Sequence, residues 1–290
     1  MRPRKAVDSI VVQDTLAQPF RIHGARGSTP VSGDRFLRYG GETTCFSIES
    51  DDELLVIDAG TGLINLGTEL TGRDKLPRVT LLFTHFHLDH VIGLPSFPLC
   101  YLPDAQIRFM CNPAVHPNWR KTLETLMGEP FWPANLTTSE ADLRFEDLPQ
   151  GGDQLTIGDL AVRSCPVPHP QGCVAFRVDG PNTSTVIATD VEYPSGPEDH
   201  FLEFCNDTDV LIYDAQYLPE EIAGYTGWGH STWQDAVSTA KRTGARELIL
   251  THHAPTRTDD KLAAIEMLAI ETFENTRVAR PGLALGSTQG

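Results

Sequence analysis

Three histidines and one aspartate lie within six consecutive positions, in the segment His85-Phe86-His87-Leu88-Asp89-His90. The apolar run at 81–83 comes just before this segment and is typical of a buried strand. Polar groups at the end of such a strand need partners, because burying them unpaired is costly. Zn²⁺ and similar ions accept imidazole and carboxylate ligands, so we predict a metal site here; the alternative is a hydrogen-bonded turn without metal. In an extended turn His85 and His87 point the same way and can share one ion, which leaves Asp89 and His90 for a second.

The composition limits the partners that such a site can serve. The chain of 290 residues carries 23 Lys and Arg against 39 Asp and Glu, a formal net charge of −16. An acidic protein repels polyphosphate backbones, so long nucleic acid is disfavoured as a partner. No window approaches 18 consecutive apolar residues, so we expect no membrane span.

The cysteines and the amino terminus indicate the compartment. All 6 cysteines stand singly in apolar surroundings, at Cys45, Cys100, Cys111, Cys165, Cys173 and Cys205. The basic start of the chain, Arg2 to Lys5, is not followed by the apolar segment of a signal peptide. We therefore expect buried free thiols rather than disulfides, and a cytoplasmic protein.

Short apolar runs bounded by Gly, Pro and Asp predict the strands that position these residues. They lie at 20–22, 45–48, 54–57, 79–83, 107–110, 160–162, 174–178, 184–188, 210–213 and 248–250. Helices are predicted over 118–127, 231–243 and 258–273. The second of these begins with a capping box in which Ser231 is the cap and Gln234 its partner, and Gly244 ends it.

The alternation of strands and helices without a linker predicts a single α/β domain over 1–290. The stretch 94–143 is the least regular part, and we interpret it as an insertion near the active-site mouth. Its apolar loop Phe131-Trp132-Pro133 is expected to wall a pocket or to pack in a homodimer.

The pattern His-x-His-x-Asp-His after a strand resembles the hallmark of the metallo-β-lactamase superfamily, and the resemblance extends from Phe20 to about His253. It implies an αββα sandwich, in which two mixed β-sheets are flanked by helices. The segment Val56-Ile57-Asp58-Ala59-Gly60 looks like the strand that ends in Asp-x-Gly upstream of the hallmark. The resemblance implies that Asp58 supports the metal loop.

The resemblance also implies the remaining metal ligands. His169, after Pro166-Val167-Pro168, looks like the third histidine of the first site, and Asp190, after a strand, looks like the aspartate that bridges two ions. His252 looks like the closing ligand and is a better match than His253, because it directly follows the strand residue Thr251.

This ligand set gives each ion an open position for a shared water, which is typical of catalytic sites. The first ion is assigned His85, His87 and His169, the second Asp89, His90 and His252, and Asp190 lies between them. We expect two divalent ions. Zn²⁺ is the expected metal and Mn²⁺ or Fe are the alternatives, because histidine and aspartate ligands discriminate weakly between these metals.

The motif Gly227-Trp228-Gly229-His230-Ser231-Thr232, with Asp214 upstream, resembles the phosphodiesterase branch of the superfamily. That branch includes transfer-RNA 3′-processing nucleases and cyclic-phosphate phosphodiesterases. The resemblance implies that His230 donates a proton and that Asp214 supports it; the alternative is that the two residues merely precede a helix and end a strand. The basic, Gly-rich RNA-gripping arm of the nucleases is not visible, which favours a small phosphodiester.

The amino-terminal segments with Arg26 and Arg38 are similar to the cyclic-nucleotide or phosphoribosyl cyclic phosphate phosphodiesterase-like group. The two arginines are candidate phosphate contacts or solvated loop residues. Glu42 departs from that group, where the position is polar and uncharged, and this argues against a phosphate contact there.

The sequence therefore predicts a metal-dependent phosphodiesterase that hydrolyses a small phosphodiester, including cyclic ones, by a metal-bridging hydroxide. Its catalytic residues would be His230, Asp214 and the ligand Asp89. Two alternatives remain: a lactonase or thioester hydrolase on the same dinuclear site, and a metal-binding sensor without turnover.

Overall fold

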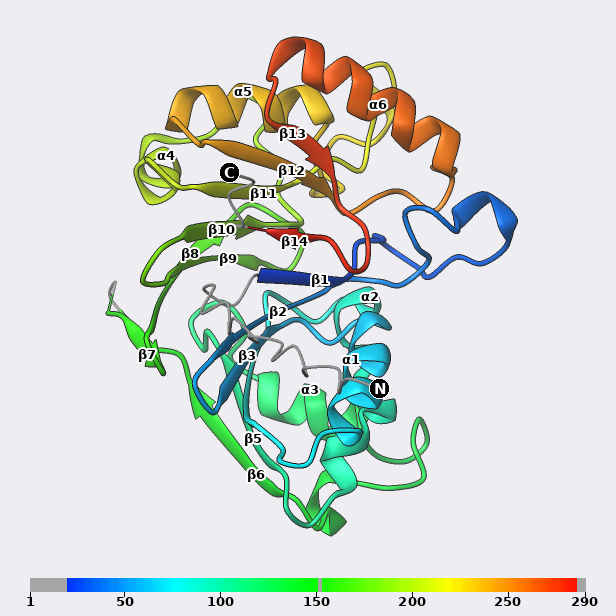
Figure 1. Cartoon of the computed structure of the whole chain (residues 1–290), viewed down its shortest axis with the longest axis vertical. Coiled ribbons are helices and arrows are strands. Elements are labelled where there is room, and N and C mark those ends of the chain that lie inside the picture. The colour runs from blue at the N-terminus through cyan, green and yellow to red at the C-terminus, as the bar shows by residue number, and fades with distance from the viewer. Residues whose placement is uncertain (1–19, 151–152, 286–290) are drawn as a thin grey trace, which may run out of the picture.

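Two seven-stranded β-sheets lie face to face in the computed structural model, which describes residues 20–150 and 153–285 (Figure 1). The first sheet has the order β14-β1-β2-β3-β4-β5-β6. Its strands are β14 (Ala284–Leu285), β1 (Phe20–Gly24), β2 (Cys45–Ser50), β3 (Glu53–Ile57), β4 (Arg78–Leu82), β5 (Gln106–Cys111) and β6 (Asp142–Asp147). The second sheet has the order β13-β12-β11-β10-β9-β8-β7. Its strands are β13 (Thr276–Val278), β12 (Glu247–Thr251), β11 (Val210–Asp214), β10 (Ser184–Ala188), β9 (Cys173–Asp179), β8 (Leu160–Val167) and β7 (Leu155–Ile157).

Helices cover the outer face of each sheet (Figure 1). The helices α1 (Gly62–Thr71) and α3 (Trp119–Leu126) lie over the first sheet, and α4 (Asp199–Cys205), α5 (Trp233–Thr243) and α6 (Asp259–Thr272) lie over the second. The short α2 (Leu88–Val91) follows β4 and carries part of the histidine segment. This arrangement confirms the predicted αββα sandwich of mixed sheets.

Apolar side chains fill three layers of this sandwich. Leu55, Leu82, Phe176, Ile212 and Ile249 belong to the layer between the sheets. A second layer lies between the first sheet and its helices, and a third between the second sheet and α4, α5 and α6. The continuous apolar runs that predicted the strands reflect this burial, since a strand covered on both faces does not alternate.

The cysteines are all free and buried, as predicted. Cys45, Cys100 and Cys111 lie in the layer under the first sheet's helices. The other three, Cys165, Cys173 and Cys205, lie in the layer under the second sheet's helices. Burial raises the pKa of each thiol, to about 11 for Cys165 and about 12 for Cys100, so the thiols stay protonated at neutral pH.

The start of α5 differs from the prediction by one residue. The capping residue is Thr232, whose hydroxyl accepts from the Asp235 amide at 3.2 Å, and the Asp235 carboxylate accepts from the Thr232 amide at 2.9 Å. The prediction of Ser231 and Gln234 as the capping box was therefore wrong. The Ser231 hydroxyl donates instead to the Val191 carbonyl at 2.6 Å.

The stretch 94–143 is more regular than predicted, because it contains three 3₁₀ turns, β5, α3 and the first residues of β6. The two aromatic residues of its apolar loop differ in their surroundings. The Phe131 ring is 67% exposed, whereas the Trp132 indole donates to the Tyr101 hydroxyl at 2.8 Å.

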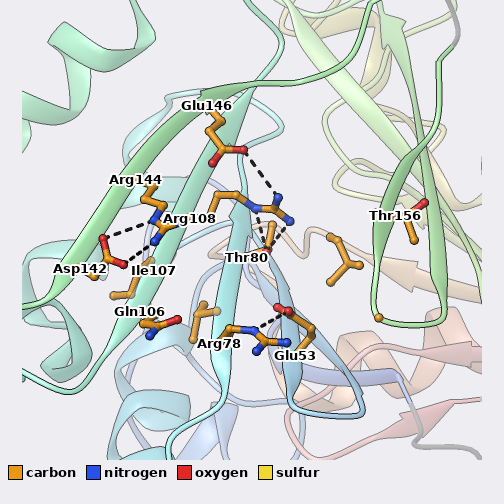
Figure 2. Close-up of a pocket in the computed structure, with 13 residues that line it drawn as sticks. Glu53, Arg78, Thr80, Gln106, Ile107, Arg108, Asp142, Arg144, Glu146 and Thr156 are labelled. Atoms are coloured by element: carbon orange, nitrogen blue, oxygen red, sulfur yellow. Dashed lines mark hydrogen bonds and ion pairs between the residues drawn. The ribbon is translucent and has the colours of Figure 1, made fainter.

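The inner face of the first sheet becomes polar where β4, β5 and β6 begin (Figure 2). Arg78 pairs there with Glu53 at 2.7 Å and Arg144 with Asp142 at 2.9 Å, while Arg108 lies 3.6 Å from Glu146. Each guanidinium has its own carboxylate, so the charges balance and this pocket has no excess of positive charge for an anion. None of the helices in the described ranges has the length and apolar character that a membrane span needs.

Candidate metal centre

Parallel strands of both sheets end at one edge of the sandwich, and the candidate ligands follow them there. His85 comes three residues beyond the end of β4, Asp190 two residues beyond β10, and His252 directly after β12. Loops at the carboxyl ends of parallel strands are the usual place for a binding site in such sheets. Asp190 and His252 have φ angles of 57° and 60°, in the left-handed region that non-glycine residues rarely adopt. Such conformations occur often at functional sites.

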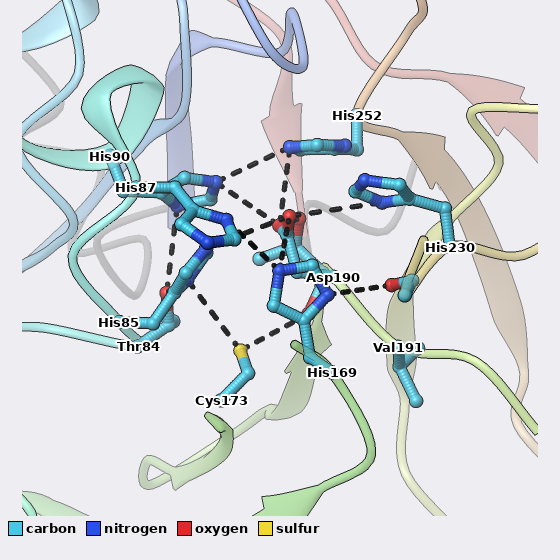
Figure 3. Close-up of polar contacts among 12 residues, drawn as sticks. Thr84, His85, His87, His90, His169, Cys173, Asp190, Val191, His230 and His252 are labelled. Atoms are coloured by element: carbon cyan, nitrogen blue, oxygen red, sulfur yellow. Dashed lines mark hydrogen bonds and ion pairs between the residues drawn. The ribbon is translucent and has the colours of Figure 1, made fainter. Parts of the chain in front are cut away.

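The first cluster contains His85, His87, His169 and Asp190, and each offers one ligand atom within 4.8 Å of the others. His169 Nε2 lies 3.1 Å from His87 Nδ1. Asp190 Oδ1 lies 3.8 Å from His85 Nε2 and 3.8 Å from His169 Nε2. Figure 3 shows these imidazoles converging on the Asp190 carboxylate.

The second cluster contains Asp89, His90 and His252, within the same 4.8 Å limit. His90 Nε2 and His252 Nε2 are 3.3 Å apart, and Asp89 Oδ2 lies 3.1 Å from His252 Nε2. Asp190 Oδ2 lies 3.1 Å from His90 Nε2 and 3.2 Å from His252 Nε2. One oxygen of Asp190 thus faces each cluster.

Hydrogen bonds on the far side of the rings orient the histidines. His90 Nδ1 donates to Asp58 Oδ2 at 2.7 Å, and His169 Nδ1 donates to the Gly229 carbonyl at 2.8 Å. His87 Nε2 donates to Gln171 Oε1 at 2.8 Å, which turns its Nδ1 toward the cluster. A proton held on the outer nitrogen leaves the inner nitrogen free to coordinate a metal. His85 Nε2 is buried and has no hydrogen-bond partner in the described chain, so the donor set fits a metal ion.

The electrostatics of the centre also fit a cation. Burial raises the pKa of Asp190, but the charges of His252 and His90 outweigh it and hold that pKa well below its usual range. Burial lowers the pKa of His85. His90 differs, since the charges of Asp190 and Asp89 outweigh burial and raise its pKa. The positive charge that these carboxylates attract is what a divalent ion supplies in place of a proton.

His230 lies beside both clusters and is held by Asp214. His230 Nδ1 donates to Asp214 Oδ2 at 2.9 Å. The other carboxylate oxygen, Oδ1, accepts from the amides of Gln216 and Ser231 at 3.0 Å each. Burial lowers the pKa of His230, but the Asp214 charge and hydrogen bond outweigh it and raise that pKa to about 9. Asp190, Asp214, His230 and His252 also satisfy the 4.8 Å criterion as a group, but the bond to Asp214 occupies the Nδ1 of His230.

The two amino-terminal arginines are engaged by protein groups. The Arg26 side chain is fully buried and donates to the carbonyls of Gly40 and Arg257 at 2.7 Å each. The Arg38 guanidinium lies over the Tyr39 ring at 4.9 Å and 3.7 Å from Glu266. Their assignment as phosphate contacts gains no support from this geometry.

Four residues that position the ligands were missed from the sequence. They are Thr84, whose hydroxyl lies 3.0 Å from His85 Nδ1; Gln171; Ser28, whose amide donates to Asp89 Oδ2 at 2.7 Å; and Glu192. The Glu192 carboxylate accepts from the amides of Gly227 at 2.8 Å and Gly229 at 2.7 Å. For two of these residues the sequence offers a signal, which is their position: Thr84 adjoins the histidine segment, and Glu192 stands two positions after Asp190.

Comparison with known proteins agrees with this geometry. A family model described as a β-lactamase superfamily domain matches residues 54–253. YhfI of Bacillus subtilis strain 168, named a probable metallo-hydrolase, is 26% identical over 222 residues, or 74% of this chain and 83% of YhfI.

Solved structures share the fold at lower identity. The crystal structure of B. subtilis YhfI aligns with a TM-score of 0.68 at 19% identity, over 92% of this chain and 98% of that one. A diphosphatase from the PhnP family gives 0.68 at 19% identity over 92% and 97% of the two chains. The short form of human tRNase Z gives 0.62 at 19% identity over 92% and 98%.

Proposed function

Because this chain belongs to the β-lactamase superfamily and is related to metallo-hydrolases, we propose that it is a phosphodiesterase with two divalent metal ions that hydrolyses a small phosphodiester, including cyclic ones. The main observation in support is the position of Asp190, with one carboxylate oxygen toward each histidine cluster. A diphosphatase and a transfer-RNA processing enzyme share the fold, and both of their names refer to the cleavage of phosphate linkages.

The ligands divide between the two ions as the clusters do. His85, His87 and His169 would hold the first ion and Asp89, His90 and His252 the second, with Asp190 shared. We expect zinc, because nitrogen and carboxylate donors at such sites suit it well. When bound, such ions would lower the pKa of a water at the site and neutralise charge on the phosphoryl oxygens.

The protein's own contribution to bond cleavage is a proton donor. A phosphodiester with an alkoxide leaving group needs a proton at the departing oxygen. His230 donates its Nδ1 proton to Asp214, which leaves the Nε2–H as the donor available to a substrate. Asp214 is itself fixed by two backbone amides, so the imidazole keeps one orientation. Lactone and thioester hydrolysis does not need this pair, which is why we favour phosphodiesters.

The charge of the chain favours a small substrate over a folded RNA. The formal net charge is −16, and a long polyphosphate would be repelled. The pocket with three arginines offers no compensating site, because each of them is paired with a carboxylate. A cytoplasmic location and a homodimer stay predictions.

Three substrate classes test the proposal. The zinc-loaded protein is expected to hydrolyse bis(p-nitrophenyl) phosphate and to leave a γ-lactone and an acyl thioester intact. Turnover of the lactone or the thioester but not of the phosphodiester would identify the rival hydrolase. Two bound equivalents of metal without turnover of any substrate would identify a sensor.

A further inference from the structure

A row of aromatic rings leads from His230 to the surface. The Tyr217 ring meets the His230 ring edge-on, with centroids 5.7 Å apart, and stacks on Tyr225 at 4.4 Å with an interplanar angle of 8°. Tyr225 in turn meets the Trp228 ring edge-on at 5.5 Å. The exposed fraction rises along the row, from 7% at Tyr217 to 38% at Tyr225 and 61% at Trp228. An indole is therefore presented to solvent at the outer end of a row of rings that starts at His230.

The backbone that carries Trp228 is fixed on both sides. The Glu192 carboxylate, 8% exposed, accepts from the amides of Gly227 and Gly229. Both glycines have left-handed φ angles, 84° and 88°. Gly229 also accepts from His169, and a Cβ there would lie 2.1 Å from His169 Nδ1, so no other residue fits.

This geometry places an exposed indole next to Gly229, whose carbonyl accepts from the candidate ligand His169. A large apolar ring costs free energy when it faces water, and among the described residues Trp228 makes a single ring contact, with Tyr225. A rigid exposed aromatic is, however, well suited to a ligand, because little ordering entropy remains to be lost on binding. Exposed apolar side chains also border the second cluster. Leu88 in α2 is 63% exposed, and Ile92, the first residue after this helix, is 41% exposed.

The position of Trp228 indicates which part of a substrate it meets. Trp228 stands two residues before His230, which in the proposed function protonates the leaving oxygen. The row of rings connects Trp228 to His230, so the substrate group on the Trp228 side is the one attached to that oxygen. We propose that the leaving alcohol of the substrate carries a flat aromatic ring, which stacks on Trp228. This inference rests on the proposed phosphodiesterase function and narrows its substrate class.

Matched substrates test the inference. The methyl phosphodiesters of thymidine and of its base-free deoxyribose analogue differ only in the ring, and those of benzyl alcohol and cyclohexylmethanol differ in its aromaticity. We expect kcat/KM to favour the ester with the aromatic ring in each pair by about 5- to 150-fold, the range that one base–aromatic stack gives. A preference in the thymidine pair alone identifies the ring as a nucleobase, and a preference in both pairs identifies any aromatic ring.

Two variants and a control assign the preference to Trp228. Trp228→Ala is expected to bring the ratio of kcat/KM values close to one, and Trp228→Phe to keep part of it. Met267→Ala removes a comparably exposed apolar side chain, 68%, on α6 and is expected to keep the full ratio. A wild-type ratio near one, or a Trp228→Ala ratio equal to that of the wild type, would overturn the inference.

Failure of the proposed function is distinguishable from failure of this inference. If the wild type hydrolyses no phosphodiester, the function is wrong, and calorimetric titration of the metal-loaded protein with thymidine and with base-free deoxyribose decides the inference. Tighter binding of thymidine that is lost in Trp228→Ala supports a ring site. Equal or absent binding of the two compounds rejects it.

Discussion

At the scale of single residues, the two oxygens of Asp190 connect the clusters. Oδ2 lies 3.1 Å from His90 Nε2 and Oδ1 lies 3.8 Å from His85 Nε2. A carboxylate that faces two clusters of nitrogen donors has the geometry of a bridge, and a bridging ligand contributes to the affinity for both ions.

Asp190→Ala should therefore lower metal content. The wild type, purified without chelator, is expected to carry close to two equivalents by elemental analysis, and the variant clearly fewer. Asp142→Ala, which removes an exposed carboxylate on β6, is the matched control and should keep the wild-type content. Two equivalents retained by Asp190→Ala would show that Asp190 does not bridge.

His230→Ala should separate substrates by leaving group. A positioned general acid contributes about 10²- to 10⁴-fold to a step that needs protonation. We expect a loss of that order in kcat for diesters with alkoxide leaving groups and a much smaller loss for a p-nitrophenyl ester, at unchanged metal content. Asp214→Asn should show the same selectivity in milder form. Equal losses on both substrate types would point instead to positioning or metal support.

The candidate ligands could be predicted from the sequence, but the residues that orient them could not. His85, His87, Asp89 and His90 are adjacent in the chain, so their spacing alone carried the signal. Gln171 lies 84 positions from the His87 ring that it orients, and Ser28 lies 61 positions from Asp89. Such pairs form only when distant segments of the folded chain come together, so no local pattern records them.

At the scale of elements, the capping box of α5 makes a measurable contribution. Thr232→Ala should lower the free energy of unfolding by about 1 kcal/mol, because the Asp235 amide loses its acceptor. Urea unfolding of the metal-free protein measures this without a contribution from bound ions. Thr258→Ala is the control, since Thr258 is the N-cap of α6 but makes no capping hydrogen bond. Equal losses in the two variants would mean that the capping hydrogen bond contributes nothing.

The elements that the sequence predicted share strong apolar patterns, and those it missed do not. All ten predicted strands occur within β1 to β12, whereas β6, β7, β13 and β14 were missed. In β6, apolar Leu143 and Phe145 alternate with charged residues at a sheet edge, and the other three have at most three residues. Of the helices, α1, α2 and α4 were missed. Two glycines weaken the helical signal of α1, and α2 has four residues, too few to show a helical period.

At the scale of the whole molecule, buried neutral histidines make stability depend on pH. Burial, with a smaller effect of the Arg21 charge, lowers the pKa of His23 to about 4, against 6.5 for an unperturbed histidine. Between these values the unfolded chain binds a proton that the folded chain does not. The contribution of His23 to the free energy of unfolding is therefore fully present above pH 6.5, and it is lost as the pH drops from 6.5 toward 4.

His23→Gln should remove this dependence. Between pH 6 and 4.5, the stability difference between wild type and variant should change by about 1.4 kcal/mol per pH unit, in favour of the variant at low pH. The other titrating groups are common to both proteins and cancel. His200→Gln, at an exposed position on α4, is the control and should follow the wild type. A difference that is constant with pH would show that His23 is protonated in the folded state.

Each half of the sandwich, meaning one sheet with its helices, buries three cysteines. The thiols can therefore report whether one half unfolds locally without the other. Three belong to the layer under α1 and α3 and three to the layer under α4, α5 and α6. A thiol reagent added under native conditions modifies only molecules that open, and mass spectrometry counts the labels on each. Halves that open together should give molecules with none or all of their thiols modified. Halves that open separately should give triply labelled molecules, and the modified cysteines would identify the half that opens first.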